Sequence, residues 1–252
     1  PKTHIERIIS LAKDFGIDLK IVTLEGFAFS NLLEDWWVAP PLSQDSLLNV
    51  ADGEIKTQKA TEVFLNIGHK KTLLCAKINN RVVFTRSLMW GADFIIQDLV
   101  KRYQLPYIEA QKMLQTTASL YLNKSQLNFD DANVSALIEK CLRDLVRDLQ
   151  MSFLEIESEL NANIASVYFT GGFSLLPNLG AYLTQQLEVA CNPVNLIGNY
   201  MTAPLNSSIP ENKIIAQFGT ALGIAIEAFK KPKNPALQFL KGDFINQNSF
   251  IK

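Results

Sequence analysis

The sequence has almost no excess charge of either sign. Its 252 residues contain 24 lysines and arginines and 25 aspartates and glutamates, so the net charge at pH 7 is −1. The basic residues form no run or stripe, whereas proteins that bind the phosphates of DNA or RNA normally carry one. Nucleic acid is therefore excluded from the expected partners.

Cysteine and histidine are also scarce. The three cysteines, Cys75, Cys141 and Cys191, are far apart and outside any C-x-x-C pair, so we predict neither a disulfide framework nor a zinc site. The two histidines, His4 and His69, are expected to be solvated. Without a nucleophile-elbow motif beside them, a Ser-His-Asp or Cys-His site is not predicted. A reducing cytosolic compartment fits best.

Long apolar runs are missing as well. No uninterrupted stretch approaches the ~18 residues of a membrane span, and the N-terminus lacks the layout of a signal peptide. Hydrophobic residues still make up 48% of the chain and charged residues 19%, which is typical of a soluble globular protein with a buried core. Since the chain opens on a helical pattern without an initiator methionine, we expect a piece of a longer protein.

The N-terminal part changes from a helical to a strand pattern. Apolar residues at helical spacing predict a helix over residues 5–15, with Thr3 as its N-cap and Gly16 as its C-terminal stop. Residues 17–24 alternate between apolar and polar side chains and predict a half-buried strand. A helix over 27–33 and a proline-containing loop over 36–53 follow.

A meander comes next. Its three strands are predicted over residues 62–67, 72–78 and 81–88. Residues 68–71 form the first turn, and Asn79-Asn80 form the second because asparagine tolerates a positive φ.

The rest of the chain alternates helices and strands, which predicts an α/β sheet. A nearly all-apolar strand over 164–170 is predicted to lie beside residues 62–67 in one mixed sheet. Asp130-Asp131 are expected to cap the long helix that follows them. The predicted helices cover 93–103, 107–122, 135–160, 177–187 and 213–229, with a short strand over 193–197.

The first candidate site is the turn between the first two strands of the meander. Asn66, Gly68 and Thr72 surround it. Glycine lets backbone N–H groups approach a phosphate closely, and a hydroxyl can add a donor. Mg²⁺ normally needs a carboxylate in such a site, and Asn66 is neutral. A plain hairpin turn is the alternative.

The second candidate site is the pair Gly171 and Gly172, which follows the buried strand over 164–170. Paired glycines at this edge of an open α/β sheet are where ligands enter. A tight strand-to-helix turn needs the same glycines without any ligand, so both readings stay open. A further pair, Gly219 and Gly223, lies inside a helix and predicts close backbone packing.

Four stretches, in this order, resemble one family. They are IERIISLAKDFGIDLKIVTLEGFAFSNLL, VFLNIGHKKTLLCAKINNRVVFTRSLMWGAD, YFTGGFSLLPNLGAYLTQQL and AQFGTALGIAI. They resemble the type IV pilus assembly protein PilM and the related cytoplasmic domain of the type II secretion protein GspL. The resemblance implies an α/β, actin-like (ribonuclease H-like) fold, with a mixed sheet flanked by helices and an incomplete first lobe.

The resemblance also implies how the chain is divided. Residues 1–55 would end the first lobe and connect to the second lobe at 56–212, and 213–230 would be a closing helix that returns to the first lobe. Residues 231–252 would be an extended tail towards a membrane span. Pro232 and Pro235 lack an N–H donor and disfavour helix before them, so we expect no helix over 232–244.

Departures from the family pattern bear on its nucleotide cleft. The family's acid at the second phosphate turn is here Asn66, for which Glu62 or Asp93 would have to substitute, and the first lobe's own nucleotide loop is expected upstream of Pro1. The resemblance thus implies a vestigial cleft without catalytic or metal-binding residues, surrounded by Asn66, Gly68, Thr72, Gly171 and Gly172. No cofactor is expected, and ATP only if the upstream lobe completes the cleft.

The resulting hypothesis is a non-catalytic scaffold of an inner-membrane assembly platform, shifted by Asn66 from the pilus towards the type II secretion system. Its expected partners are the assembly ATPase and other platform subunits, with a homodimer as a further option, and its expected location is the cytoplasmic side of a bacterial inner membrane. The alternatives are an ATP-binding actin-like protein with nucleotide-dependent partner binding and a polymerising cell-division actin.

Overall fold

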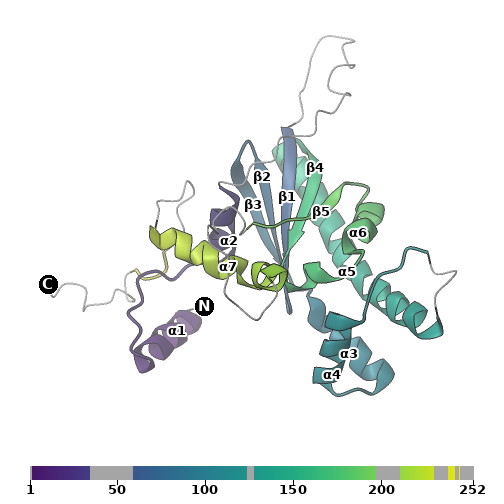
Figure 1. The fold of residues 1–252 in the computed structure, drawn as a ribbon. Coiled ribbons are helices and arrows are strands. Elements are labelled where there is room, and N and C mark those ends of the chain that lie inside the picture. Colours follow the sequence, from purple (N-terminus) through teal and green to yellow (C-terminus); the bar gives the residue numbers. More distant parts are fainter. Residues whose placement is uncertain are drawn as a thin grey trace, which may run out of the picture.

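Strand β1 (Lys59–Ile67) is the centre of a five-stranded mixed sheet with the order β3-β2-β1-β4-β5 (Figure 1). It pairs antiparallel with β2 (Thr72–Ile78), which pairs antiparallel with β3 (Arg81–Leu88). On its other side β1 runs parallel to β4 (Ala162–Thr170), and β5 (Cys191–Pro193) continues the parallel part. The prediction that residues 164–170 lie beside 62–67 is confirmed, because Asn66 is opposite Thr170.

The computed structural model describes residues 2–34, 59–123, 128–196, 211–229, 238–241 and 244. The loop predicted over 36–53 lies outside these residues, as does most of the tail over 232–244. Of the described residues of that tail, 238–241 carry no helix, as predicted, whereas Phe244 has a 3₁₀ conformation and its N–H donates to the Lys241 carbonyl.

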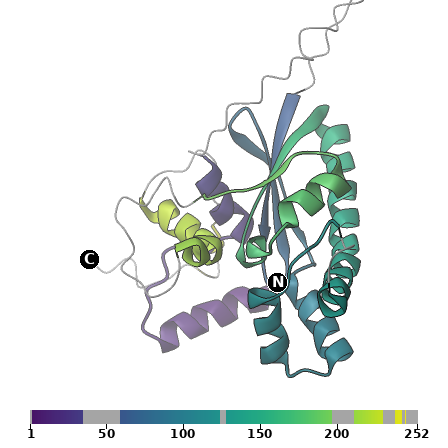
Figure 2. The same cartoon turned by 45° about the vertical axis from the view of Figure 1, so that its right-hand side comes forward.

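The meander is built by local sequence. Asn79 and Asn80 adopt φ values of 49° and 63°, which gives the tight turn predicted for this pair. Every residue of β2 is buried, because helices cover both faces of the sheet there. Figure 2 shows these two layers of helices on either side of the strands.

One face of the sheet carries the larger core. Val63, Leu65 and Ile67 of β1 point to this side and pack with Leu74 and other buried apolar residues. The helices that cover the face are α3 (Ala92–Tyr103), α4 (Tyr107–Thr116), α5 (Phe129–Leu160) and α6 (Leu179–Leu187).

The opposite face carries a second, smaller core. Phe64, Leu73 and Cys75 point to this side, where they contact α2 (Glu25–Leu33) and α7 (Glu211–Phe229). Helix α1 (Lys2–Asp14) lies farther out, and Ala12 is its buried residue. The alternation of the two faces along β1 is what a strand covered on both sides requires.

Two expectations about the N-terminal part are wrong. Thr3 is inside α1, which already begins at Lys2, so it is not the N-cap. Residues 17–24 form no strand in the described structure, because no strand of the sheet runs beside them. Gly16 does end α1 in the left-handed region, with φ +65°.

Three expectations about later elements also need correction. Helix α4 ends at Thr116 instead of residue 122, because the chain turns so that the Leu120 N–H reaches the Pro177 carbonyl. Asn128 and not Asp130-Asp131 caps α5, because its side chain accepts from the Asp131 N–H. Asp130 and Asp131 lie in the first turn, where their negative charges interact favourably with the helix dipole. Strand β5 spans Cys191–Pro193 and not 193–197, of which residue 197 is outside the described part.

Helices α2 and α7 touch at the backbone. A Cβ atom on Gly223 would lie 1.9 Å from the Ala28 carbonyl oxygen, so only glycine permits this approach. Next to it, the buried Asn31 amide donates to the Gly223 carbonyl at 3.0 Å and to Glu227 Oε2 at 2.8 Å. The close packing predicted for this glycine is therefore observed, and it fixes α7 on α2.

This contact generates a matched pair of variants. Gly223→Ala should lower the free energy of unfolding by at least about 2 kcal/mol, because the new methyl group collides with a backbone carbonyl. Gly219→Ala on the same helix meets only Leu32 Cδ1 at 3.6 Å and should raise it by up to about 1 kcal/mol through helix propensity. Urea unfolding measures both; equal effects of the two variants would refute the contact.

Candidate functional site

A cavity of about 600 Å³ opens at the carboxyl ends of the parallel strands β1 and β4. It lies between the turn after β1, the 3₁₀ helix η2 (Gly172–Leu175), helices α3 and α4, and α7. This edge of a parallel sheet is where ligands commonly bind in α/β folds. Its polar lining within the described residues is Glu25, Asn66, His69, Gln111, Gln115, Lys213, Gln217 and Thr220.

The structure brings three of the five predicted site residues to this cavity. Asn66, Gly68 and Gly172 line it. Thr72 does not, because its side chain is fully buried and its hydroxyl donates to the Trp90 carbonyl at 2.9 Å. Gly171 also stays behind the cavity wall, where it packs against Asn66 and the Ile67 carbonyl.

Asn66 uses its amide to hold α7. Its Nδ2 donates to Thr220 Oγ1 at 3.2 Å, and its Oδ1 faces Gly171. The residue that stands where a phosphate turn would present an acid therefore joins β1 to the helix across the cavity.

Glu25 is the one carboxylate that lines the cavity among the described residues. It forms an ion pair with Lys71, which ends the turn after β1. The positive charge of Lys71 is thus paired with the carboxylate of Glu25. This pair joins the turn to α2, in parallel with the bond from Asn66 to α7.

The two acids considered as substitutes for Asn66 do not line the cavity. Glu62 lies opposite Lys77 in the register of β1 and β2, and its burial raises the pKa of its carboxyl above the usual value. Asp93 stands at the start of α3, where its carboxylate accepts from the Tyr107 hydroxyl at 2.6 Å. Neither is placed to hold a metal inside the cavity.

His69, Asp93 and Tyr107 form a polar cluster at the rim that the sequence did not predict. The Tyr107 hydroxyl is 3.0 Å from His69 Nε2, and His69 Nε2 is 3.6 Å from Asp93 Oδ1. His69 is exposed, as predicted, with 45% of its side chain accessible. The N–H of Asp93 also donates to the His69 carbonyl at 2.8 Å, which clamps the turn to α3. The three residues come from three different elements, so no local sequence pattern predicts that they meet.

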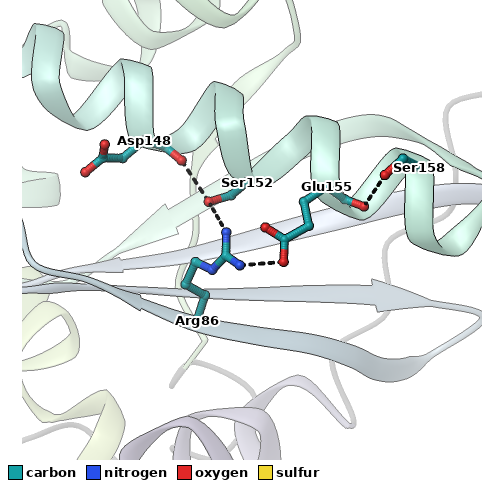
Figure 3. Close-up of polar contacts among 5 residues, drawn as sticks. All are labelled: Arg86, Asp148, Ser152, Glu155 and Ser158. Carbon is teal, nitrogen blue, oxygen red and sulfur yellow. Dashed lines mark hydrogen bonds and ion pairs between the residues drawn. The ribbon is translucent and has the colours of Figure 1, made fainter.

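Arg86 serves the fold and not the cavity (Figure 3). Its guanidinium donates to Ser152 Oγ at 3.3 Å and to Glu155 Oε1 at 2.5 Å, and Ser152 in turn donates to the Asp148 carbonyl at 2.7 Å. Ser152, Glu155 and Asp148 all belong to α5. Arg86 thus ties β3 to α5.

The described residues contain neither a metal-binding cluster nor a membrane-spanning helix. No three His, Cys, Asp or Glu side chains come together there as a set of metal ligands. None of the helices described has both the length and the apolar character that crossing a membrane requires.

The two glycines of the second candidate site should respond differently to alanine. Gly171 has φ +95°, and a Cβ there would lie 2.5 Å from the Ile67 carbonyl oxygen, so Gly171→Ala should cost at least about 2 kcal/mol of unfolding free energy. Gly172 faces open space, so Gly172→Ala should stay within about 0.5 kcal/mol of the parent. Thermal unfolding of both compares them; a harmless Gly171→Ala would contradict this geometry.

Tyr107 should titrate late. Partial burial and the hydrogen bond to Asp93 raise the pKa of Tyr107 to about 12. Because this folded-state pKa exceeds the usual value of about 10, the stabilisation is complete below pH ~10 and is lost as the pH rises through the folded pKa. Asp93→Asn should bring the pKa of Tyr107 down, whereas Asp98→Asn on the same helix should not. Phenolate absorbance follows the titration, and identical curves for the parent and Asp93→Asn would refute the bond.

Comparison with known structures identifies the fold. The chain is similar to a structure of the PilM-PilN type IV pilus biogenesis complex, with 18% identity and a TM-score of 0.68 over 90% of this chain and 58% of that one. It is also similar to MreB5 of Spiroplasma citri bound to AMPPNP, with 13% identity and a TM-score of 0.56 over 90% and 64% of the two chains. These likenesses show the actin-like fold that the sequence predicted.

Sequence comparison gives the family. No curated protein matches the chain, and the chain spans 58% of the length of the matched pilus protein structure. The family model of the type IV pilus assembly protein PilM matches residues 2–229. The match covers most of the chain, and the chain therefore belongs to the PilM family of type IV pilus assembly proteins.

Proposed function

We propose that this chain is a non-catalytic scaffold in type IV pilus assembly, whose surfaces bind the assembly ATPase and other subunits of the inner-membrane platform. The observation that carries the proposal is the hydrogen bond from the Asn66 amide to Thr220. It uses the position of the phosphate-turn acid for a contact within the protein. In this proposal the chain keeps the actin-like fold but does not bind or hydrolyse a nucleotide.

The charges around the cavity support this proposal. Mg²⁺ bound with a nucleotide is usually held by one or two carboxylates together with the phosphates. Asn66 is neutral, and the carboxylate of Glu25 is paired with Lys71. Of the six other polar residues of the lining, three are the amides Gln111, Gln115 and Gln217, and the others are His69, Lys213 and Thr220. A magnesium-bound triphosphate would therefore enter a cavity that offers its metal no free carboxylate among the described residues.

The partner of the proposed scaffold follows from the matched structure. That structure is a complex of PilM with PilN, and we extend to this chain a partner of the same kind in the platform. The proposed location is the cytoplasmic side of the inner membrane. Assignment to a type II secretion system and formation of a homodimer stay predictions.

Nucleotide binding is the alternative function, and the cavity favours it. A space of about 600 Å³ remains at the strand ends, and the similar MreB5 structure is of a protein bound to AMPPNP. The two functions differ in one measurable property, the affinity for Mg-ATP.

Calorimetric titration with Mg-ATP separates them. The parent chain should show no micromolar binding, because it lacks a metal-holding carboxylate in the cavity. Asn66→Asp places a carboxylate there and tests whether this one residue silences the cleft. Asn133→Asp adds the same charge on α5 and is the matched control.

The outcomes are distinct. Binding that is absent from the parent and from Asn133→Asp but tight in Asn66→Asp would support the scaffold and assign the loss to residue 66. Absence from all three would support the scaffold without that assignment. Micromolar affinity of the parent chain would overturn the proposal in favour of the nucleotide-binding alternative.

A further inference from the structure

A second cavity, of about 380 Å³, lies between the connection that follows α4 and the helices α5 and α6. These two helices cover the face of the sheet opposite α7 (Figure 1). The polar lining of this cavity among the described residues is Tyr121, Asn123, Glu139, Tyr182, Gln185 and Gln186. None of them lines the first cavity, so the two cavities are separate.

The carboxylate of Glu139 is positioned by a buried serine. Ser135 is fully buried, and its hydroxyl donates to Glu139 Oε1 at 3.1 Å and accepts from the Tyr121 N–H at 3.0 Å. One hydroxyl therefore holds both the carboxylate on α5 and the backbone of the facing wall. Binding sites commonly contain a small number of polar groups that are placed in this way before a ligand arrives.

The wall formed by the connection after α4 is also anchored to the start of α6. The Asn178 amide donates to the Leu120 carbonyl at 2.6 Å, and the Leu120 N–H donates to the Pro177 carbonyl at 3.2 Å. Asn178 directly precedes α6. The connection is thus bonded to α5 through Ser135 and to the start of α6 through Asn178, so the fold itself sets the walls of the cavity.

Glu139 is the only charged residue in this lining among the described residues. Burial raises the pKa of Tyr182, and the nearby carboxylate of Glu139 raises it further, against an opposite effect of Arg143. The Tyr182 hydroxyl lies 3.5 Å from the Glu139 carbonyl oxygen. The cavity therefore combines one negative charge with the rings of Tyr121 and Tyr182, and both features attract a cation.

The distribution of acceptors favours a planar cation. The Tyr121 hydroxyl and the side-chain amides of Gln185 and Gln186 have no hydrogen-bond partner among the described residues. A carboxylate accepts several bonds at once, so Glu139 can accept from a ligand as well as from Ser135. A guanidinium has five N–H donors in a planar fork and stacks on aromatic rings, whereas an ammonium is a compact point charge. Acceptors spread over several walls suit the planar fork.

We propose that this cavity binds the guanidinium group of an arginine side chain that a partner presents, with Glu139 as the opposite charge and Tyr121 and Tyr182 as aromatic walls. Arginine is one of the residues that most often dominate the binding energy of a protein interface when they fill a pocket. The identity of the ligand as a partner's side chain rests on the proposed scaffold function, whereas the guanidinium site itself does not.

Blocked amino acids test the chemistry of the site. Nα-acetyl-arginine amide is titrated by NMR into the full chain, beside the corresponding citrulline compound, which has nearly the same shape without the charge, and the lysine compound. The arginine compound should bind at least tenfold more tightly than the citrulline compound and shift the amides of Tyr121 and Gln185. A smaller difference, or lysine binding as tightly as arginine, would overturn the proposal.

A matched pair of variants tests the role of Glu139. Glu139→Gln keeps an acceptor for Ser135 and removes the charge, so the preference for arginine over citrulline should disappear. Glu159→Gln removes an exposed carboxylate from α5 outside the cavity and should leave the preference unchanged. A preference that survives in Glu139→Gln, or that both variants lose, would contradict the assignment. Unchanged amide shifts in β1 and β4 verify the fold of each variant.

Free L-arginine distinguishes a partner's side chain from the free amino acid. Since both probes carry the same guanidinium, free arginine should bind less than tenfold more tightly than the blocked compound. A larger advantage would show that the cavity takes the amino acid, and would overturn the proposed partner. None of these titrations contains Mg-ATP, so failure here is distinct from failure of the proposed function.

Discussion

The position of α7 is the constraint on which the site depends. Two contacts hold this helix. The first is the backbone of Gly223 against Ala28 of α2, where the Asn31 amide also donates to the Gly223 carbonyl. The other is the Asn66 amide, which reaches from β1 to Thr220. Together they place α7 over the carboxyl ends of β1 and β4, and the cavity is the space that this placement leaves. A change at either contact alters the cavity before it alters the sheet.

The same contact connects the fold to the proposed function. In a nucleotide-binding actin-like domain, the two sides of the cleft are joined through the ligand and its metal, whose phosphates and carboxylates have to be held together. Here they are joined through the protein, by Asn66 to α7 and by Lys71 to Glu25 of α2. A cleft whose two sides are joined by its own side chains needs no ligand to keep its shape. That property suits a platform whose surfaces have to persist between cycles of assembly.

Much of the sheet was predictable because its signals are local. The positive φ values at Asn79-Asn80 and the apolar run before Gly171 depend only on neighbouring residues. The site was predicted in part, since Asn66 is next to the last residue of β1 and Gly68 and Gly172 follow strand ends. The side-chain direction of Thr72, by contrast, is set by Trp90, a residue outside the turn. The backbone N–H of Val22 is bonded to Gln238, which is 216 residues away in the sequence. No local pattern encodes a contact of that separation, and the same holds for the cluster of His69, Asp93 and Tyr107.

The central claim is that residue 66 acts as a structural donor to α7 and not as a remnant of a metal site. A double-mutant cycle measures this directly from the unfolding free energies of the parent, Asn66→Ala, Thr220→Ala and the double variant. If the side chains are bonded, the two substitutions should be non-additive, with a coupling energy of about 1 kcal/mol. Additive effects within error would show that Asn66 and Thr220 do not hold α7, and would contradict the account.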